Sequence, residues 1–188
     1  MKKTIDLLIR LPYWYGVGIV IAYSILFAEF FSTLIHIALD NDFLANNLIV
    51  IFLKINYGII ILFGIVVWIV MTFMFHLTAL LFDGQIQFKR FLYISAYPYI
   101  IPAIMILVGI FLLDGIEISG TEDAAMELTN NASFKLAMNL INLSFILYYI
   151  MIAILIRYVY NINFLKAAAS VVIPIVSVWG ITELFKLV

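Results

Sequence analysis

Long runs of apolar residues, separated by short polar segments, dominate the pattern along this chain. Five runs reach the roughly 20 residues that a helix needs to cross the hydrocarbon core, and they cover 13–39, 55–82, 91–113, 134–160 and 167–187. A shorter apolar stretch, 43–53, is either an interfacial segment or an early, tilted start of the second helix. The pattern predicts an all-α integral membrane bundle of about five transmembrane helices, forming a single domain over residues 1–188.

Basic residues flank the predicted helices unequally, and in membrane proteins Lys and Arg accumulate in cytoplasmic loops. With the amino terminus inside, seven cations fall on the cytoplasmic side and three on the other. The longest polar connection, 114–133, then becomes an acidic outer loop. The charges therefore predict an N-inside, C-outside topology. The inner group is Lys2, Lys3, Arg10, Lys89, Arg90, Arg157 and Lys166, and the outer group is Lys54, Lys135 and Lys186.

The composition narrows the class of protein further. Hydrophobic residues make up 66% and charged residues 11% of the sequence, whereas soluble domains contain about 45–50% apolar and 25% charged residues. With a net charge of −1 and scattered basic residues, the chain lacks the electropositive surface that nucleic-acid binding requires. The absence of cysteine excludes disulfides and thiolate chemistry.

Of the polar side chains inside the predicted spans, four are candidates for a function, because polar and above all ionisable groups at membrane depth are costly. Glu29 and His36 are seven residues apart and so share one face of the first helix. His76 belongs to the second helix and Asn142 to the fourth. Glu and His can ligate zinc, but no motif arranges these residues for it. They either line a polar path through the membrane or form hydrogen bonds within the bundle.

Motifs for catalysis and cofactor binding are absent from the sequence. It contains no Gly-x-Ser-x-Gly element, no His-Glu-x-x-His motif and no glycine-rich phosphate loop. We therefore predict a non-enzymatic protein without catalytic residues, bound metal or cofactor. An intramembrane enzyme remains a third alternative only because Glu and His are present.

The most distinctive segment joins the second and third predicted spans. Gly84 can end the second helix, and Phe88 begins the third beside the basic pair Lys89 and Arg90. Two cations in a short loop favour the cytoplasmic side of the membrane. The segment therefore predicts a helical hairpin with a basic tip at the inner surface.

Two prolines follow within the third span. Pro98 and Pro102 each lack the backbone donor of a helical hydrogen bond, and the proline ring collides with the preceding turn. Neighbouring helices can compensate for such a break inside a membrane bundle. We expect the third helix to bend near its inner end.

This segment resembles the Yip family, the Ypt/Rab-interacting membrane proteins and their bacterial relatives. In that family a His near the end of the second span precedes a Gly-Gly pair, a Phe-Lys/Arg element, and Tyr and Pro early in the third span. Asp83 stands where the first glycine is usual, and the interval from Tyr97 to Pro102 is one residue longer unless Pro98 takes that part. Four residues occupy matching positions: His76, Gly84, Phe88 and Lys89.

The resemblance implies a compact, bacterial-type member of the cytoplasmic membrane, acting in trafficking, in envelope homeostasis or beside an exporter. Its partners would be membrane lipids and another membrane protein, and a homo-oligomer is left open. The hairpin tip around Gly84, Phe88, Lys89 and Arg90 would contact the partner or anionic headgroups, although topology alone also explains the two cations. The alternative from another class is a small transporter, channel or lipid-moving protein whose path is lined by the four intramembrane polar residues.

Overall fold

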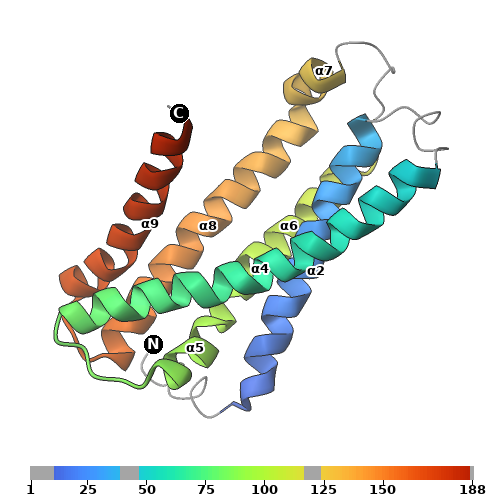
Figure 1. Cartoon of the computed structure of the whole chain (residues 1–188). Coiled ribbons are helices and arrows are strands. Elements are labelled where there is room, and N and C mark those ends of the chain that lie inside the picture. The colour runs from blue at the N-terminus through green and yellow to red at the C-terminus, as the bar shows by residue number, and fades with distance from the viewer. Residues whose placement is uncertain (1–10, 39–46, 117–123, 187–188) are drawn as a thin grey trace. The chain divides into compact units, whose positions relative to one another are not determined.

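The computed structural model describes residues 11–38, 47–116 and 124–186, and within these ranges all regular structure is helical (Figure 1). Five helical stretches are long and apolar enough to cross a membrane. By helix length and hydropathy the chain is a multi-pass membrane protein, which confirms the expected all-α class and five spans. The helices are α2 (Tyr13–Ala38), α4 (Asn47–Leu81), α5 (Phe88–Ser95), α6 (Ile100–Leu113), α7 (Ala124–Asn130), α8 (Ala132–Val159) and α9 (Phe164–Lys186).

The second span begins at Asn47, which decides between the two alternatives for the short apolar stretch in favour of an early start of the second helix. Helix α4 starts at Asn47 and runs for 35 residues without interruption. Of the short apolar stretch 43–53, residues 47–53 therefore belong to α4, and 43–46 lie outside the described residues. At 1.5 Å per residue the helix is about 52 Å long, whereas the hydrocarbon core is roughly 30 Å thick. It must tilt or extend past the core.

The third span is interrupted close to its prolines. Helix α5 ends at Ser95, a short 3-10 turn (η1, Tyr97–Tyr99) follows, and α6 begins at Ile100. Pro98 lies within this turn, whereas Pro102 is the third residue of α6. The first four N–H groups of a helix have no partner inside the helix. The missing donor of Pro102 therefore breaks no hydrogen bond of α6.

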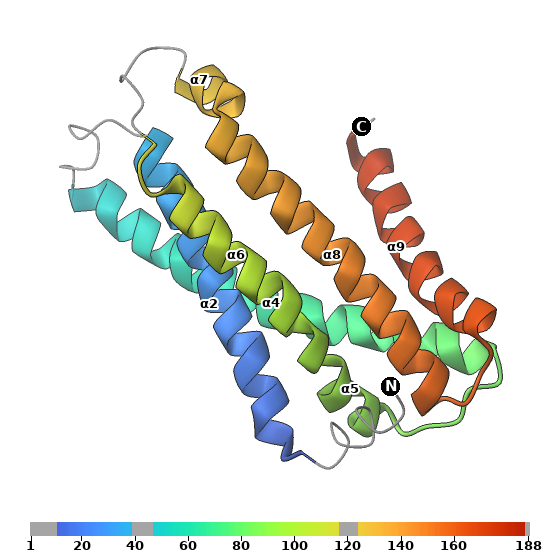
Figure 2. The same cartoon turned by 180° about the vertical axis from the view of Figure 1, so that it is seen from behind.

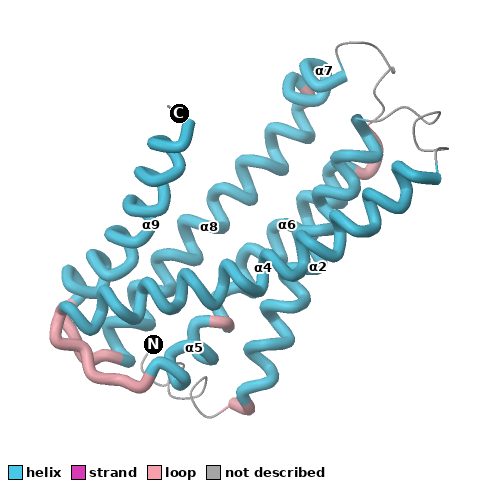
Figure 3. Tube along the Cα trace, in the orientation of Figure 1, coloured by secondary structure: helices cyan, strands magenta, loops and turns pink. Residues whose placement is uncertain are grey.

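The chain divides into two compact units. Unit 1 comprises the described parts of 1–19, 66–98 and 147–188, and unit 2 comprises those of 20–65 and 99–146. Helices α2, α4 and α8 therefore each contribute to both units. In unit 1 the loop after α4 lies beside the loop between α8 and α9 (Figure 3). In unit 2, α2 and α6 run side by side (Figure 2).

Small residues allow the helices of each unit to approach closely. In unit 1 a Cβ on Gly16 of α2 would lie 2.8 Å from the Tyr93 carbonyl oxygen of α5. In unit 2 a Cβ on Gly64 of α4 would lie 2.5 Å from the Ser24 hydroxyl of α2. Such contacts suit a bundle in lipid, where van der Waals packing rather than the hydrophobic effect holds helices together.

Candidate functional site

The hairpin between α4 and α5 begins with a closed helix end. The Gly84 N–H donates to the Ala79 carbonyl oxygen and the Asp83 N–H to that of Leu80, both at 3.1 Å. This pair of bonds is a Schellman motif, in which the residue after the cap is left-handed. That residue is Asp83, with φ of 67°. The motif ends α4 and sets the direction in which the chain leaves it.

Gly84 is buried against the end of α8. A Cβ placed on it would lie 2.6 Å from Cδ1 of Tyr160 and 2.7 Å from the Ala79 carbonyl oxygen. Both distances are shorter than real Cβ contacts, so a side chain here would force the ring or the backbone to move. Gly84 is therefore an internal packing position rather than an exposed part of the tip.

His76 lies at the centre of an aromatic cluster in unit 1. Only 7% of it is exposed, and its Nδ1 lies 2.5 Å from the hydroxyl of Tyr160, which directly follows α8. Its ring centroid is 5.3 Å from that of Phe88 and 6.4 Å from that of Phe91. Burial raises the pKa of the Tyr160 hydroxyl, so this group stays protonated and can donate a hydrogen bond to Nδ1. His76 thereby gains a fixed partner.

Buried hydroxyl groups connect α4 to α5 in the same unit. The indole N–H of Trp68 donates to the Ser95 hydroxyl over 3.2 Å, and the Thr72 hydroxyl lies 3.0 Å from the same oxygen. Trp68 lies in the middle of its span, where an interfacial aromatic residue is not expected. Its bond to Ser95 accounts for that position, because a buried indole N–H needs an acceptor.

The basic pair lies on the outside of this hairpin. Lys89 and Arg90 are both exposed in the first turn of α5, next to the half-buried Phe88. Behind them, the Lys166 ammonium at the start of α9 lies 3.1 Å from the Asp83 carboxylate. Because both partners are exposed, this ion pair contributes about 0–1 kcal/mol at most. Packing around Gly84 and His76, rather than charge, holds the hairpin in place.

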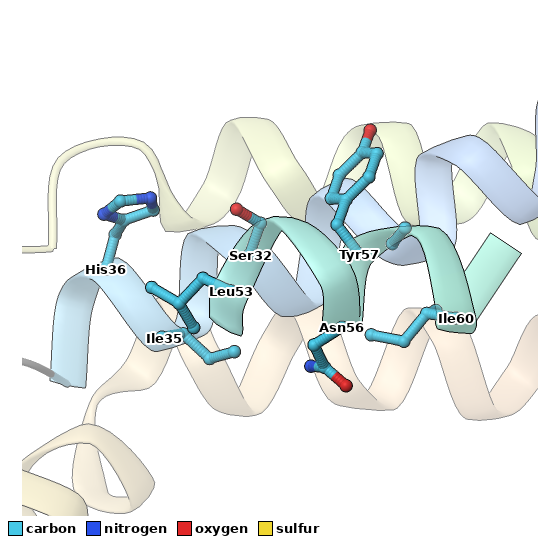
Figure 4. A pocket seen from close by; sticks show the side chains of 8 residues that line it. Ser32, Ile35, His36, Leu53, Asn56, Tyr57 and Ile60 are labelled. Carbon is cyan, nitrogen blue, oxygen red and sulfur yellow. The ribbon is translucent and has the colours of Figure 1, made fainter. Parts of the chain in front are cut away.

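A hollow with a mainly apolar lining and a few polar side chains lies between α2 and α4 in unit 2. Ser32, His36 and Tyr57 project to the same side of the two helices, whereas Asn56 projects to the other (Figure 4). The hollow encloses about 420 Å³ and is lined by Ser32, His36, Val50, Leu53, Lys54 and Tyr57. A smaller cavity of about 20 Å³, whose lining side chains are those drawn in Figure 4, shares Ser32, His36, Leu53 and Tyr57 with this hollow. Glu29 lies one turn before Ser32 on α2 and interacts electrostatically with Tyr57, but it does not line the hollow.

The four intramembrane polar residues thus have different surroundings. His36 lines the hollow of unit 2, whereas Glu29 on α2 and Asn142 on α8 of that unit are exposed and do not line it. His76 belongs to unit 1, where Tyr160 binds it. No group of three or more His, Asp or Glu side chains in the described ranges is arranged to hold a metal ion.

Two residues of these sites, Tyr160 and Tyr57, could not be identified from the sequence. Tyr160 ends the fourth span among other tyrosines, and nothing in the local pattern separates it from an interfacial ring. Tyr57 lies in a run of apolar residues and has no motif around it. Tyr160 binds His76, which is 84 residues away in the sequence. Tyr57 interacts with Glu29, which is on another helix. Only the packing of the helices reveals these pairs.

Comparisons with known proteins add no name to these sites. No protein-family model, curated protein or solved structure matches the chain.

Proposed function

We propose that this chain is a non-enzymatic membrane protein of the Yip type, inserted N-inside and C-outside in a bacterial cytoplasmic membrane. It acts as an interaction or accessory factor in trafficking, in envelope homeostasis or beside an exporter. The observation that carries the proposal is that the α4–α5 hairpin contains both buried packing residues and exposed cations. His76 and Gly84 are used in internal packing, while Lys89 and Arg90 remain exposed at the tip.

The local geometry supports the resemblance at its Gly-Gly position. Asp83 takes the place of the first glycine and adopts φ of 67°, a conformation that glycine accepts without strain. Gly84 takes the place of the second and has no room for a Cβ. Two successive glycines therefore satisfy two separate physical requirements of this turn. The Phe-Lys element follows at Phe88, whose ring packs on His76.

A basic tip at the inner surface has two uses beyond fixing the topology. Each cation near an anionic leaflet is attracted by about 1 kcal/mol, and Arg also forms paired hydrogen bonds with carboxylates of a protein partner. The tip is supported from behind by buried aromatic residues, so Lys89 and Arg90 are presented in a fixed position. A preformed contact of this kind loses little entropy on binding.

The test compares the tagged wild type with K89A/R90A after purification in mild detergent, with co-purified proteins and lipids identified by mass spectrometry. The matched control, K135A/R157A, also removes two exposed cations but lies on α8. We expect a stoichiometric partner, or an enrichment of anionic lipid, to fall at least tenfold in K89A/R90A and to persist in the control.

A charge-preserving swap separates the two uses of the tip. K89R/R90K keeps both charges and therefore the topology and the attraction to anionic lipid, but exchanges the planar guanidinium for an ammonium. Loss of a protein partner in the swap indicates geometric recognition, and retention of a lipid indicates electrostatic attraction alone. Identical proteins and lipids in all variants would contradict the proposal and leave Lys89 and Arg90 as topological signals.

The second candidate, a transporter or lipid-moving protein, is favoured by one observation. The hollow between α2 and α4 has polar groups on a membrane-spanning segment of unit 2. Transport activity in reconstituted vesicles that is lost in H36A and kept in N142A would support this candidate, because His36 lines the hollow and Asn142 does not.

A further inference from the structure

The polar side chains that line the hollow of unit 2 are all able to donate hydrogen bonds. Lys54 and His36 are exposed there, and Ser32 and Tyr57 are half-buried in its wall. Among the described residues that line the hollow, none carries a carboxylate, and the Lys54 ammonium forms no ion pair with another described side chain. One positive charge and several neutral donors therefore face the same space, a set that suits an anion.

The donors lie at matching depths on two helices that run in opposite directions. A Cβ on Gly64 of α4 would touch Ser24 of α2, so these two positions fix the register of the pair. His36 is 12 residues after Ser24, and Lys54 is 10 residues before Gly64. At 1.5 Å per residue the two levels differ by only about 3 Å along the helices. Ser32 lies one turn deeper than His36.

This level is close to one end of both spans. His36 is two residues before the last residue of α2, Ala38, and Lys54 is seven residues after Asn47, about 10 Å along α4. Helix α4 is longer than the hydrocarbon core is thick by about 20 Å, so its first turns can reach the headgroup layer. A lysine near a helix end also extends its ammonium toward the interface. The hollow is therefore at a depth where lipid phosphates lie.

We propose that this hollow binds the phosphate of an anionic phospholipid, such as phosphatidylglycerol. The Lys54 ammonium supplies the counter-charge, and the His36 ring N–H and the Ser32 hydroxyl donate hydrogen bonds to the phosphate oxygens. The volume of about 420 Å³ falls within the usual 300–1,000 Å³ of ligand pockets. This site is in unit 2 and is separate from the hairpin tip, which belongs to unit 1.

The position of Glu29 favours an anionic lipid over a zwitterionic one. Glu29 is seven residues before His36 on α2, about 10 Å farther from that end of the span, and it does not line the hollow. In a zwitterionic phospholipid the ammonium extends from the phosphate toward water, away from this carboxylate. A lipid with a net negative charge therefore matches the hollow better, because its charge is balanced by Lys54.

Apolar surface favours a lipid over a soluble phosphate. Val50 and Leu53 line the hollow itself, and Ile59 and Leu62 are exposed on α4 deeper in the span than Lys54. Acyl chains that extend inward from a phosphate at the hollow can pack along such side chains. A free phosphate would gain nothing from them.

The experiment measures binding of short-chain phosphatidylglycerol to the purified full-length protein in detergent, with phosphatidylcholine of equal chain length as the comparison. We expect K54M to weaken phosphatidylglycerol binding about tenfold, the value for one lost charge-assisted hydrogen bond, and H36L about fivefold, the value for a neutral one. K54R keeps the charge and should keep most of the affinity. K135M, which removes an exposed lysine of α8 in the same unit, should bind as the wild type does.

Two further measurements separate the hollow from other effects. Each variant is made both in the wild type and in K89A/R90A, and the loss caused by K54M should be the same in both, because the hairpin tip is a different site. The thermal midpoint of each variant without lipid checks that it is folded. Should K54M not fold, a photoreactive phosphatidylglycerol on the wild type decides, because its adducts must map to 32–36 and 50–57.

Three results would overturn the proposal. Equal affinity for phosphatidylcholine would remove the role of the net charge of the lipid. Unchanged binding in K54M and H36L, or loss of all binding in K89A/R90A alone, would place the lipid elsewhere. Competition by free glycerol phosphate at the same concentration as the lipid would assign the hollow to a soluble phosphate.

Discussion

At the scale of single residues, the bond between His76 and Tyr160 should contribute measurably to stability. Replacing Tyr160 by Phe keeps the ring that packs on Phe91, 5.1 Å away, but leaves buried Nδ1 of His76 without a partner. We expect Tyr160→Phe to lower the free energy of unfolding by about 1–3 kcal/mol, the cost of an unsatisfied buried polar group. Denaturant titration of the protein in detergent, followed by circular dichroism, measures this loss.

Tyr158 provides the matched control for that variant. It lies two residues earlier on α8, is 38% exposed, and its ring lies below the Arg157 guanidinium, a contact that Phe preserves. Tyr158→Phe should leave the unfolding curve unchanged. A stability loss in Tyr158→Phe as large as that in Tyr160→Phe would show that hydroxyl removal at this helix end, and not the bond to His76, is responsible.

Gly84 tests the close approach of the hairpin to α8. In Gly84→Ala the new Cβ would meet the Tyr160 ring and the Ala79 carbonyl oxygen at distances below 3.0 Å. Overpacking of this kind costs about 1–3 kcal/mol. In Gly18→Ala nothing lies within 4 Å of the new Cβ, and alanine favours the helix by about 1 kcal/mol. Thermal melts should therefore shift in opposite directions, and equal shifts would contradict the packing at Gly84.

The sequence singled out His76 as an ionisable residue inside an apolar run, but it could not identify the partner. An ionisable residue inside an apolar run is visible locally, because its cost depends only on its surroundings in the membrane. Its hydrogen bond depends on Tyr160, 84 residues farther along the chain. Glu29 and Tyr57, which interact electrostatically, likewise come from two different helices. Such pairs follow from helix packing, which periodicity does not encode.

At the scale of elements, the end of α4 explains why a residue other than glycine is tolerated in the turn. The left-handed backbone of Asp83, with φ of 67°, is strained, and its side chain forms the ion pair with Lys166. Relief of backbone strain in Asp83→Gly, about 1 kcal/mol, should offset the loss of an exposed ion pair worth 0–1 kcal/mol. We expect a change in unfolding free energy close to zero.

A comparison of two variants separates these contributions. Lys166→Ala removes the ion pair without changing the backbone of Asp83, so it should be neutral or slightly destabilising, and less so at high salt. Asp83→Ala removes the pair and keeps the strain, and it should be the least stable of the three. A large destabilisation by Asp83→Gly in the same chemical denaturation would mean that the carboxylate has a further role in the turn.

Element boundaries were predictable where one local signal dominates. The Gly84 region ends α4 close to the predicted limit, since a Schellman motif needs only a few consecutive residues. The sequence left the start of α4 open between an early helix start and an interfacial segment, because Lys54 interrupts an apolar run that continues as one helix from Asn47. A lysine within a long helix can extend its ammonium toward the interface, so a single cation does not mark a helix end.

At the scale of the whole molecule, composition and run length predicted the class and the number of spans. Both are dictated by the thickness and polarity of the bilayer, which act on each helix separately. The division of the described chain into two compact units was not predicted. The contacts within each unit depend on which small residues meet across helices, as Gly64 meets Ser24 in unit 2 and Gly16 meets Ala96 in unit 1. Glycines are visible in the sequence, but their partners are not.

Topology can be measured directly because the chain contains no cysteine. A single introduced cysteine then reports on one position without background labelling. Gln85→Cys places it in the exposed α4–α5 loop, and Thr129→Cys places it on exposed α7 beyond the third span. For an N-inside protein the first site faces the cytoplasm. A membrane-impermeant maleimide should therefore label Thr129→Cys in intact spheroplasts and Gln85→Cys only after lysis.

A third position makes the same experiment sensitive to membrane depth. Leu62 is 65% exposed in the middle of the second span. If that face contacts lipid, the maleimide should label Leu62→Cys neither in intact spheroplasts nor after lysis, because thiolates form poorly away from water. Labelling of Gln85→Cys in intact spheroplasts would invert the orientation and place Lys89 and Arg90 outside, which removes the basis for an inner-surface tip. Labelling of Leu62→Cys would instead show that water reaches this face of α4, and the exposed apolar surface there would need a protein partner rather than lipid.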